Sequence, residues 1–255
     1  MSSKVWRGRR SASLCGSRDR TRTLREHVWS RGYVAGFDAL IDYFDVQLPR
    51  HEEISGGLRV EATMYPKLAI RELVANALIH QDLTMGGVSP LVEIFSDRIE
   101  ITNPGTPLID TLRFIDEPPR SRNEVLAALM RRFSICEERG SGIDKVITAV
   151  ESAHLPPPDF LVTENHTKAI LYGPRKLAGM ERQDKIRACY QHACLLYVSG
   201  ARMTNATLRN RLGITEKNYS VASRIIADTI RRELLRPSDP ESTSRKHASY
   251  VPFWA

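Results

Sequence analysis

Hydrophobic residues between positions 66 and 82 recur at the spacing of an α-helix that is buried over most of its surface. The apolar positions are Leu68, Ile70, Leu73, Val74, Ala77, Leu78 and Ile79. Pro66 stands at the beginning of this stretch, where the first turn of a helix tolerates proline. The pattern therefore predicts a central helix against which the rest of its domain packs.

Three polar residues interrupt this apolar helix at regular intervals. Glu72, Asn76 and His80 follow one another at i, i+4 and i+8, so they share one stripe of the helix surface. Buried polar groups need hydrogen-bond partners. Two interpretations remain open: the three side chains are satisfied inside the core, or they face a ligand. A histidine at this depth is more often a hydrogen-bonded core group than a catalytic one.

Residues 92–105 alternate between apolar and polar side chains around Ser96-Asp97, which predicts a β-hairpin. Asn103-Pro104-Gly105 closes it with a sharp turn. Further on, Gly140-Ser141-Gly142 leads into an amphipathic helical pattern over residues 143–153. Successive glycines at a helix N-terminus leave backbone N–H groups free to hold an anion.

The other periodic segments of this part are typical of an α+β domain. Ser121 is the expected N-cap of the next helix, with Glu124 three residues later completing a capping box. We expect a helix over residues 25–48, a short strand over 54–61, a helix over 125–133, and strands over 160–162 and 169–174.

The C-terminal part has the pattern of a winged helix-turn-helix. A helix is predicted over residues 182–198, a short one capped by Thr204 and ended by Gly213, and a longer one over 216–235. A polar loop between residues 237 and 250 would form the wing. A winged helix also serves protein contacts, and that alternative stays open. The residues predicted to face DNA are Lys217, Asn218, Tyr219, Ser220 and Arg224 on the second helix, and Arg245 and Lys246 on the wing.

The charge distribution divides the chain into three blocks. Residues 1–32 carry nine Lys/Arg against two Asp/Glu, residues 33–180 carry 15 against 21, and residues 181–255 carry 13 against 7. The basic C-terminal block suits a polyanionic partner such as DNA, although a solvated basic face explains it equally well. The Ser- and Arg-rich residues 1–22 are expected to form a disordered basic arm.

Several function classes are disfavoured by the sequence. The four cysteines have no metal-ligand spacing and indicate reduced thiols in the cytoplasm. No apolar run approaches the length of a membrane span, and no secretory signal is visible. The chain has no Gly-x-x-x-x-Gly-Lys-Ser/Thr loop, so it is not expected to be a helicase by itself.

The order of the motifs resembles a known ATP-binding fold. A Glu-x-x-x-Asn helix, a hairpin ending in Asn103-Pro104-Gly105 and a Gly-x-Gly helix start are similar to the GHKL fold of gyrase, histidine kinases and the MutL repair proteins. The closest resemblance is to the bacterial RecG-like C-terminal ATP-binding family of transcriptional regulators. It implies a GHKL-like two-layer α/β sandwich over residues 23–175, a linker over 176–180 and a winged helix-turn-helix domain over 181–255.

The resemblance also implies roles for individual residues. Glu72 would activate the attacking water, and Asn76 would ligate Mg²⁺ on the phosphates of ATP. Asn103 and Gly105 stand where the superfamily has an Asp-x-Gly that binds adenine, and Gly140, Ser141 and Gly142 correspond to the glycine-rich lid segment. A cluster of arginines has two open explanations, salt bridges or contacts to the phosphates. Its members are Arg120, Arg122, Arg131, Arg132 and Arg139.

The leading hypothesis is an ATP- and DNA-binding transcriptional regulator of the cytoplasm, in which nucleotide orders a lid over residues 106–139 and biases the winged helix. It would act on double-stranded DNA, outside any membrane, and could form a homodimer. Two alternatives remain: an ATPase with Glu72 as general base, and a scaffold that no longer hydrolyses ATP. Relatives in this family often carry a preceding domain of the Schlafen or AlbA type, so the chain resembles the C-terminal part of a longer architecture.

Overall fold

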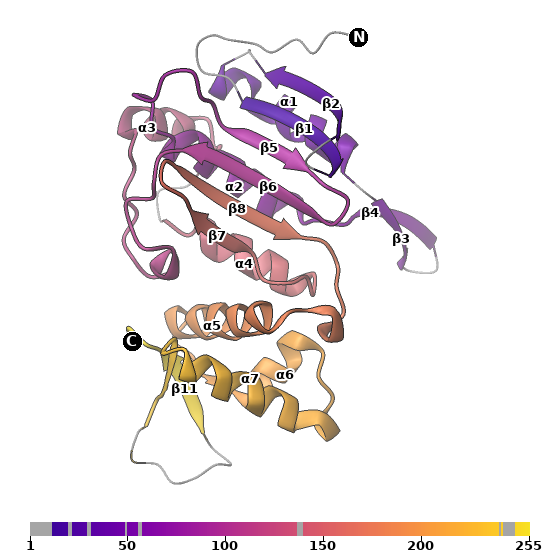
Figure 1. The fold of residues 1–255 in the computed structure, drawn as a ribbon, viewed down its shortest axis with the longest axis vertical. Helices are drawn as coiled ribbons and strands as arrows, with labels where there is room; N and C mark the ends of the chain where they lie inside the picture. Colours follow the sequence, from indigo (N-terminus) through magenta and orange to yellow (C-terminus); the bar gives the residue numbers. More distant parts are fainter. Residues whose placement is uncertain are drawn as a thin grey trace. The chain divides into compact units, whose positions relative to one another are not determined.

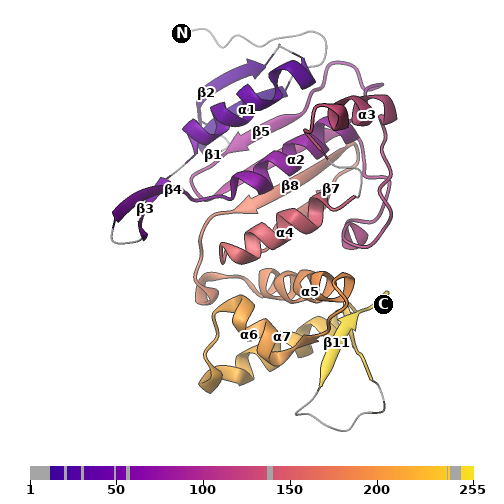
Figure 2. The ribbon, with the colours of Figure 1, turned by 180° about the vertical axis from the view of Figure 1, so that it is seen from behind.

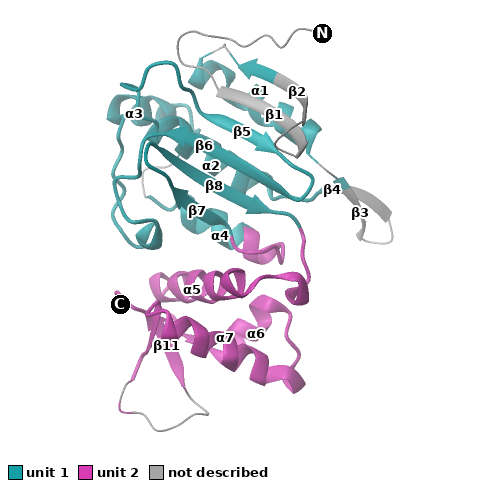
Figure 3. Ribbon diagram, in the orientation of Figure 1, with its two compact units in different colours: residues 1–149, 158–173 teal, residues 150–157, 174–255 magenta. Residues whose placement is uncertain are grey.

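The computed structural model describes residues 12–19, 22–29, 32–48, 50–55, 58–136, 140–239, 241 and 248–255. These residues belong to two compact units, shown in Figure 3. Unit 1 comprises Met1–Ala149 and Pro158–Gly173, and unit 2 comprises Val150–Pro157 and Pro174–Ala255. Each unit is described by itself below.

Unit 1 contains a six-stranded sheet with the strand order β2-β1-β5-β6-β8-β7. Neighbouring strands are antiparallel except β1 and β5, which are parallel. Helices α1, α2 and α4 lie on one face of this sheet, as Figures 1 and 2 show from its two sides. The α+β class and the two-layer arrangement predicted from the sequence are therefore confirmed. The strands are β1 (Ala12–Asp19), β2 (Arg22–Trp29), β5 (Leu91–Ile94), β6 (Arg98–Pro104), β7 (Asp159–Val162) and β8 (His166–Tyr172).

The helices of unit 1 are α1 (Tyr33–Gln47), α2 (Lys67–His80), α3 (Glu124–Arg132) and α4 (Gly142–Ser152), with a 3-10 turn over Thr111–Arg113. A separate hairpin of β3 (Arg50–Ser55) and β4 (Leu58–Thr63) precedes α2. The predicted central helix is confirmed as α2, most of whose apolar residues are buried. Leu68 is the exception at 45% exposed, since it lies on the outer side of the first turn.

The predicted hairpin is confirmed as β5 and β6. The alternation of apolar and polar side chains along it determines which face of the sheet packs against the helices. Ile94 pairs with Ile99 and Val92 with Ile101, and all four side chains are buried. The same face continues into β8, where Ile101 pairs with Ala169 and Asn103 with Thr167. The helix-facing side of the sheet is thus apolar along β5 and β6 and becomes polar at the end of β6.

The N-terminal predictions were partly wrong. The helix expected over residues 25–48 begins only at Tyr33, because residues up to Trp29 form β2 and Gly32 takes the left-handed φ of +82° that separates the two elements. Part of the expected disordered arm, Ala12–Asp19, is strand β1 paired with β2 and β5. The rest of that arm before Arg22 lies outside the described residues. The single strand expected over 54–61 is instead divided between β3 and β4.

The predicted cap of α3 was also wrong. The helix begins at Glu124 with Asn123 as its N-cap residue, two positions after Ser121. The Asn123 side chain does not cap its own helix; its carboxamide donates to the carbonyl oxygens of Ile79 and Gln81, 2.7 Å and 2.8 Å away. Asn123 therefore satisfies carbonyl groups at the C-terminal end of α2, which have no partner within the helix.

The described residues of unit 2 include helices α5, α6 and α7 and a three-stranded antiparallel sheet with the order β10-β11-β9. Thr204 caps α6 by accepting from the Thr207 backbone N–H at 3.2 Å, and Gly213 ends the helix at φ +64°, both as predicted. The elements are α5 (Arg182–Val198), β9 (Met203–Thr204), α6 (Asn205–Leu212), α7 (Tyr219–Arg231), β10 (Leu235–Pro237) and β11 (Ser249–Pro252), with 3-10 turns over Leu177–Gly179 and Glu216–Asn218.

The longer helix predicted over residues 216–235 is shorter than expected. Its first three residues, Glu216–Asn218, form a 3-10 turn, so α7 begins at Tyr219. At the other end Glu233 adopts the left-handed φ of +60°, which an α-helix does not accept. Helix α7 therefore ends at Arg231, and the chain enters β10 at Leu235.

A buried ion cluster lies inside unit 2, where the chain leaves α4. The Glu151 carboxylate lies 3.0 Å from His192 Nδ1 and 3.2 Å from Arg211 Nε. Arg211 also donates from Nη2 to the Leu155 carbonyl oxygen at 2.8 Å, and its side chain is only 4% exposed. Burial lowers the pKa of Arg211, while the charge and hydrogen bond of Glu151 oppose this shift. The cluster joins residues of α4, α5 and α6 within one unit.

Candidate functional site

Unit 1 contains a cavity of about 500 Å³ between the helix-facing side of the sheet and helices α2, α3 and α4. Its walls combine apolar residues of the strands and helices with charged residues of α2, α3 and the connecting segments. Residues of the wall include Glu72, Asn76, His80, Asn103, Thr106, Arg122, Arg131, Gly140, Gly142, Lys145 and Thr167.

The predicted polar stripe of α2 faces this cavity. Glu72, Asn76 and His80 all belong to its wall, and the carboxyl group of Glu72 is buried with 7% of the residue exposed. Burial lowers the pKa of His80, and the charge of Arg122 lowers it further, so the imidazole is neutral at pH 7. Of the two interpretations left open by the sequence, the structure favours a stripe that faces a hollow.

The Gly-x-Gly turn approaches this stripe from a distant part of the chain. A Cβ atom added to Gly142 would lie 3.0 Å from Glu72 Oε2 and 3.6 Å from Asn76 Nδ2. Gly140 has a φ of +68°, and a Cβ there would lie 2.9 Å from Pro119 Cδ. Close packing and a left-handed backbone therefore require glycine at position 140, while Gly142 begins α4 with its backbone directly beside the two polar side chains.

The residues at the end of β6 form the opposite part of the wall. Asn103 is buried, with its Nδ2 donating to the Pro104 carbonyl oxygen at 3.3 Å. Thr167, its register partner on β8, donates from its hydroxyl to the Gly105 carbonyl oxygen at 2.7 Å. Gly105 and Ser141 are absent from the cavity wall among the described residues. Gly105 packs instead against Asp82, whose Cβ would be 3.0 Å from an added Cβ.

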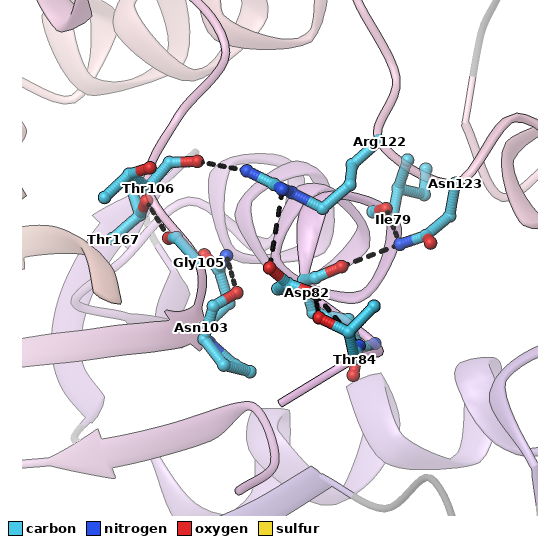
Figure 4. Close-up of polar contacts among 11 residues, drawn as sticks. Ile79, Asp82, Thr84, Asn103, Gly105, Thr106, Arg122, Asn123 and Thr167 are labelled. Carbon is cyan, nitrogen blue, oxygen red and sulfur yellow. Dashed lines mark hydrogen bonds and ion pairs between the residues drawn. The ribbon is translucent and has the colours of Figure 1, made fainter. Parts of the chain in front are cut away.

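A polar network joins this end of β6 to the end of α2 (Figure 4). The Arg122 guanidinium donates from Nη2 to the Thr106 carbonyl oxygen at 2.6 Å, and its Nη1 lies 3.5 Å from Asp82 Oδ2. The backbone N–H of Asp82 donates to the Pro104 carbonyl oxygen at 2.8 Å, and its Oδ1 accepts from the hydroxyl and the N–H of Thr84. Hydrogen bonds from Thr84 lower the pKa of Asp82, so this carboxylate is charged and holds Arg122 in place.

The cavity thus has two chemically different ends. We call the part around Glu72, Asn76 and Gly142 the Glu72 end, and the part around Asn103, Thr106 and Thr167 the Asn103 end. Along α2 they are separated by the eight residues from Glu72 to His80, or about 12 Å at the rise of an α-helix.

Charge and apolar surface in the wall together indicate the class of ligand. The described residues of the wall include four cations and two carboxylates, Glu72 and Glu117, which is an excess of positive charge. Apolar side chains cover much of the remainder, including Phe114 and Phe160, which meet edge to face at 5.3 Å. A ligand with an apolar ring and a strongly anionic tail matches such a wall. The cations are Arg120, Arg122, Arg131 and Lys145.

The Mg²⁺ predicted at Asn76 would have few protein ligands. In the described part of the chain, no group of three or more His, Cys, Asp or Glu side chains converges on a point. At the Glu72 end, the Asn76 carboxamide and the Glu72 carboxylate are the side chains in the described cavity wall that offer oxygens. Mg²⁺ normally binds proteins through one or two such groups and takes its other ligands from phosphates and water. The donor set therefore fits a magnesium that arrives with a phosphate ligand, and does not fit a metal site built from protein alone.

The predicted DNA-facing residues belong to unit 2. Lys217 and Asn218 lie in the 3-10 turn before α7, Tyr219 and Ser220 begin the helix, and Arg224 follows one turn later. All five are exposed, and Tyr219 is 61% exposed. Arg245 and Lys246 lie outside the described residues.

Sequence reasoning missed Asp82, Asn123 and Thr167. Asn123 carried one local signal, since an asparagine before a helical pattern suggests a cap, but its partners are 42 and 44 residues away. Thr167 becomes part of the site only through the register of β6 and β8, which its neighbours in sequence do not determine. Arg122 was singled out only as one member of a basic cluster.

Part of this chain is similar to a known family, and most of it is similar in fold to a solved structure. Residues 87–171 match the protein-family model described as "Putative ATP-dependent DNA helicase recG C-terminal". This range contains Asn103, Gly140 and Gly142, while α2 precedes it. The structure of the DIP2311 protein from Corynebacterium diphtheriae is similar in fold, with a TM-score of 0.61 and 18% sequence identity. The similarity covers 95% of this chain and 51% of that one, so this chain spans about half the length of that protein.

The comparison with curated proteins gave no match. No helix in the described part of the chain is long and apolar enough to cross a membrane. The matched residues 87–171 lie in the sequence range of unit 1 and are similar to the RecG C-terminal family, and the likeness in structure supports the fold.

Proposed function

We propose that this chain, which carries a domain of the RecG-like C-terminal ATP-binding family, binds ATP in the cavity of unit 1 and duplex DNA through unit 2. The observation that carries the proposal is the approach of Gly142 to Glu72 and Asn76, 3.0 Å and 3.6 Å from an added Cβ. This approach puts the amino end of α4 beside the two α2 side chains whose oxygens could face a metal ion bound by the phosphates or a water. A helix N-terminus attracts anions through its free N–H groups and its dipole.

In this proposal the triphosphate occupies the Glu72 end and the base occupies the Asn103 end. The Asn103 carboxamide can accept a hydrogen bond from an exocyclic amine of the base, with apolar side chains such as Ile101 and Phe160 around the ring. Mg²⁺, brought by the phosphates, would bind the Asn76 oxygen and neutralise part of their charge. Glu72 is held where it could orient or activate a water, which keeps hydrolysis as the alternative activity.

The binding prediction is tested by isothermal titration of the full chain with ATP and MgCl₂. We expect Asn76→Ala to lower the affinity for Mg-ATP by about tenfold or more, because a charge-assisted contact contributes about 1.5–3 kcal/mol. Asn210→Ala, a surface asparagine of unit 2, is the matched control and should bind as the wild type does. No heat from folded wild-type protein at millimolar Mg-ATP would remove the basis of the proposal.

In a DNA-binding regulator of this kind, α6, α7 and the turn between them would contact the duplex. Asn205 on α6 donates to the Tyr219 carbonyl oxygen at 3.0 Å and to Ser223 Oγ at 2.9 Å, which fixes the start of α7 on α6. This arrangement of a short helix, a turn and an exposed second helix suits insertion into a major groove. Helix α4 begins with cavity residues, and its last residues, from Val150, are assigned to unit 2.

DNA binding is tested by fluorescence anisotropy with a labelled duplex at several salt concentrations. We expect Lys217→Ala and Arg224→Ala each to weaken binding and to reduce the slope of log K against log salt by about 1, because each removes a phosphate contact. Lys176→Ala, an exposed lysine of unit 2 outside α6 and α7, should leave the slope unchanged. If the wild-type protein binds no duplex at low salt, unit 2 serves another partner.

A further inference from the structure

Helix α3 runs along α2 in the opposite direction, and contacts at both of its ends establish this. At its beginning, the Asn123 carboxamide donates to the carbonyl oxygens of Ile79 and Gln81, at the end of α2. Just past its end, the Ser134 carbonyl oxygen accepts from Arg71 Nη2 at 3.2 Å, at the beginning of α2. Arg71 is itself held by Asp38 at 2.8 Å. The two helices are therefore fixed antiparallel along the length of the cavity.

This direction assigns the two arginines of the wall to different ends. Arg122 precedes α3 and is fixed by Asp82 and the Thr106 carbonyl oxygen, so it lies at the Asn103 end. Arg131 lies three residues before Ser134, level with the turn of α2 that carries Glu72. It belongs to the same face of α3 as Ala127, one turn earlier, which also lines the cavity.

The charges that act on the Cys136 thiol also indicate that Arg131 lies near Glu72. Burial raises the pKa of the Cys136 thiol, the charge of Arg131 lowers it, and the charge of Glu72 raises it. Arg131 and Glu72 are thus both near the same thiol. Lys145, one turn into α4 from Gly142, is another cation in the wall.

We infer that Arg131 is the residue that contacts the terminal phosphate of the bound nucleotide, so that the cavity prefers a nucleoside triphosphate to a diphosphate. The inference rests on the proposed nucleotide binding and adds which residue distinguishes the ligands. A guanidinium pairs with two phosphate oxygens at once, which suits the γ-phosphate, with three non-bridging oxygens, more than the α- and β-phosphates of ATP, with two each. Arg122, at the other end, contributes equally to ATP and ADP.

The test compares Mg-ATP with Mg-ADP by isothermal titration of the full chain. We expect Arg131→Ala to weaken ATP binding by about tenfold or more and ADP binding by less than about threefold. Arg132→Ala changes an exposed arginine in the same turn of the same helix and should alter neither affinity. Arg122→Ala should weaken the two ligands by the same factor.

The outcomes separate the inference from the proposal on which it rests. If the wild type binds neither nucleotide, nucleotide binding itself is wrong. If the wild type binds ATP but Arg131→Ala lowers the affinities for ATP and ADP by the same factor, only the role of Arg131 is wrong. The same holds if Arg131→Ala leaves both affinities unchanged. Should Arg131→Ala fail to fold, Arg131→Lys decides: loss of the ATP-over-ADP preference supports the inference, and an unchanged preference overturns it.

Discussion

Glu151→Ala is expected to destabilise unit 2 by about 3–5 kcal/mol, the largest stability effect we predict for a single substitution. The Glu151 carboxylate is the partner of both His192 Nδ1 and Arg211 Nε, at 3.0 Å and 3.2 Å. With Ala at position 151, the Arg211 guanidinium keeps its bond to the Leu155 carbonyl oxygen at 2.8 Å but loses its ion pair with Glu151. A charge that is 4% exposed would then have no counter-charge from Glu151, which is far more costly than losing a surface ion pair.

Urea denaturation followed by far-ultraviolet circular dichroism measures this effect. Glu164→Ala, which removes an exposed carboxylate in the turn between β7 and β8, should stay within about 0.5 kcal/mol of the wild type. The double variant Glu151→Leu with Arg211→Met replaces both charges by apolar groups of similar size and should recover most of the loss. If Glu151→Ala lies within about 1 kcal/mol of the wild type, or the double variant recovers nothing, the unpaired charge is not the cause.

Local elements could be predicted from the sequence, whereas the buried cluster of Glu151, His192 and Arg211 could not. Helix α2 and the β5–β6 hairpin were predictable because the period of their apolar residues is a local property. The pairing of Glu151 with Arg211 joins positions 60 residues apart, and no pattern near either residue announces it. The local pattern also gave a wrong prediction where two elements follow each other closely. Residues 25–48 were expected to form one helix, but strand β2 ends at Trp29 and α1 begins after Gly32.

For the candidate site, the sequence provided the residues and the structure provided their distances. Glu72 and Asn76 were predictable as neighbours on one helix face, because they are four residues apart. That Gly142 lies beside them depended on a resemblance to a known fold, since 66 residues separate Gly142 from Asn76. Gly105 was predicted to bind the ligand by the same resemblance, yet it packs on Asp82 and lies outside the cavity wall.

Gly142→Val is expected to abolish measurable ATP binding, by about 100-fold or more in affinity, while the protein stays folded. The first added atom would already lie 3.0 Å from Glu72 Oε2, and the two γ-methyl groups extend further toward Asn76. Glu72 has a flexible side chain and can move away, so the fold can adjust. Its movement would, however, displace the carboxylate from the Glu72 end, where we propose that the triphosphate binds. The methyl groups would also fill the space in front of the α4 amino end.

The experiment pairs this variant with a glycine that has room around it. A Cβ at Gly86 meets nothing within 4 Å, and its backbone is not left-handed, so Gly86→Val should bind Mg-ATP as the wild type does. Gly142→Ala should fall between the two, because it adds only the atom that touches Glu72. Melting curves show whether each protein is folded before it is titrated. A folded Gly142→Val protein with wild-type affinity would mean that the ligand does not occupy the Glu72 end, since no phosphate could share that space with two methyl groups.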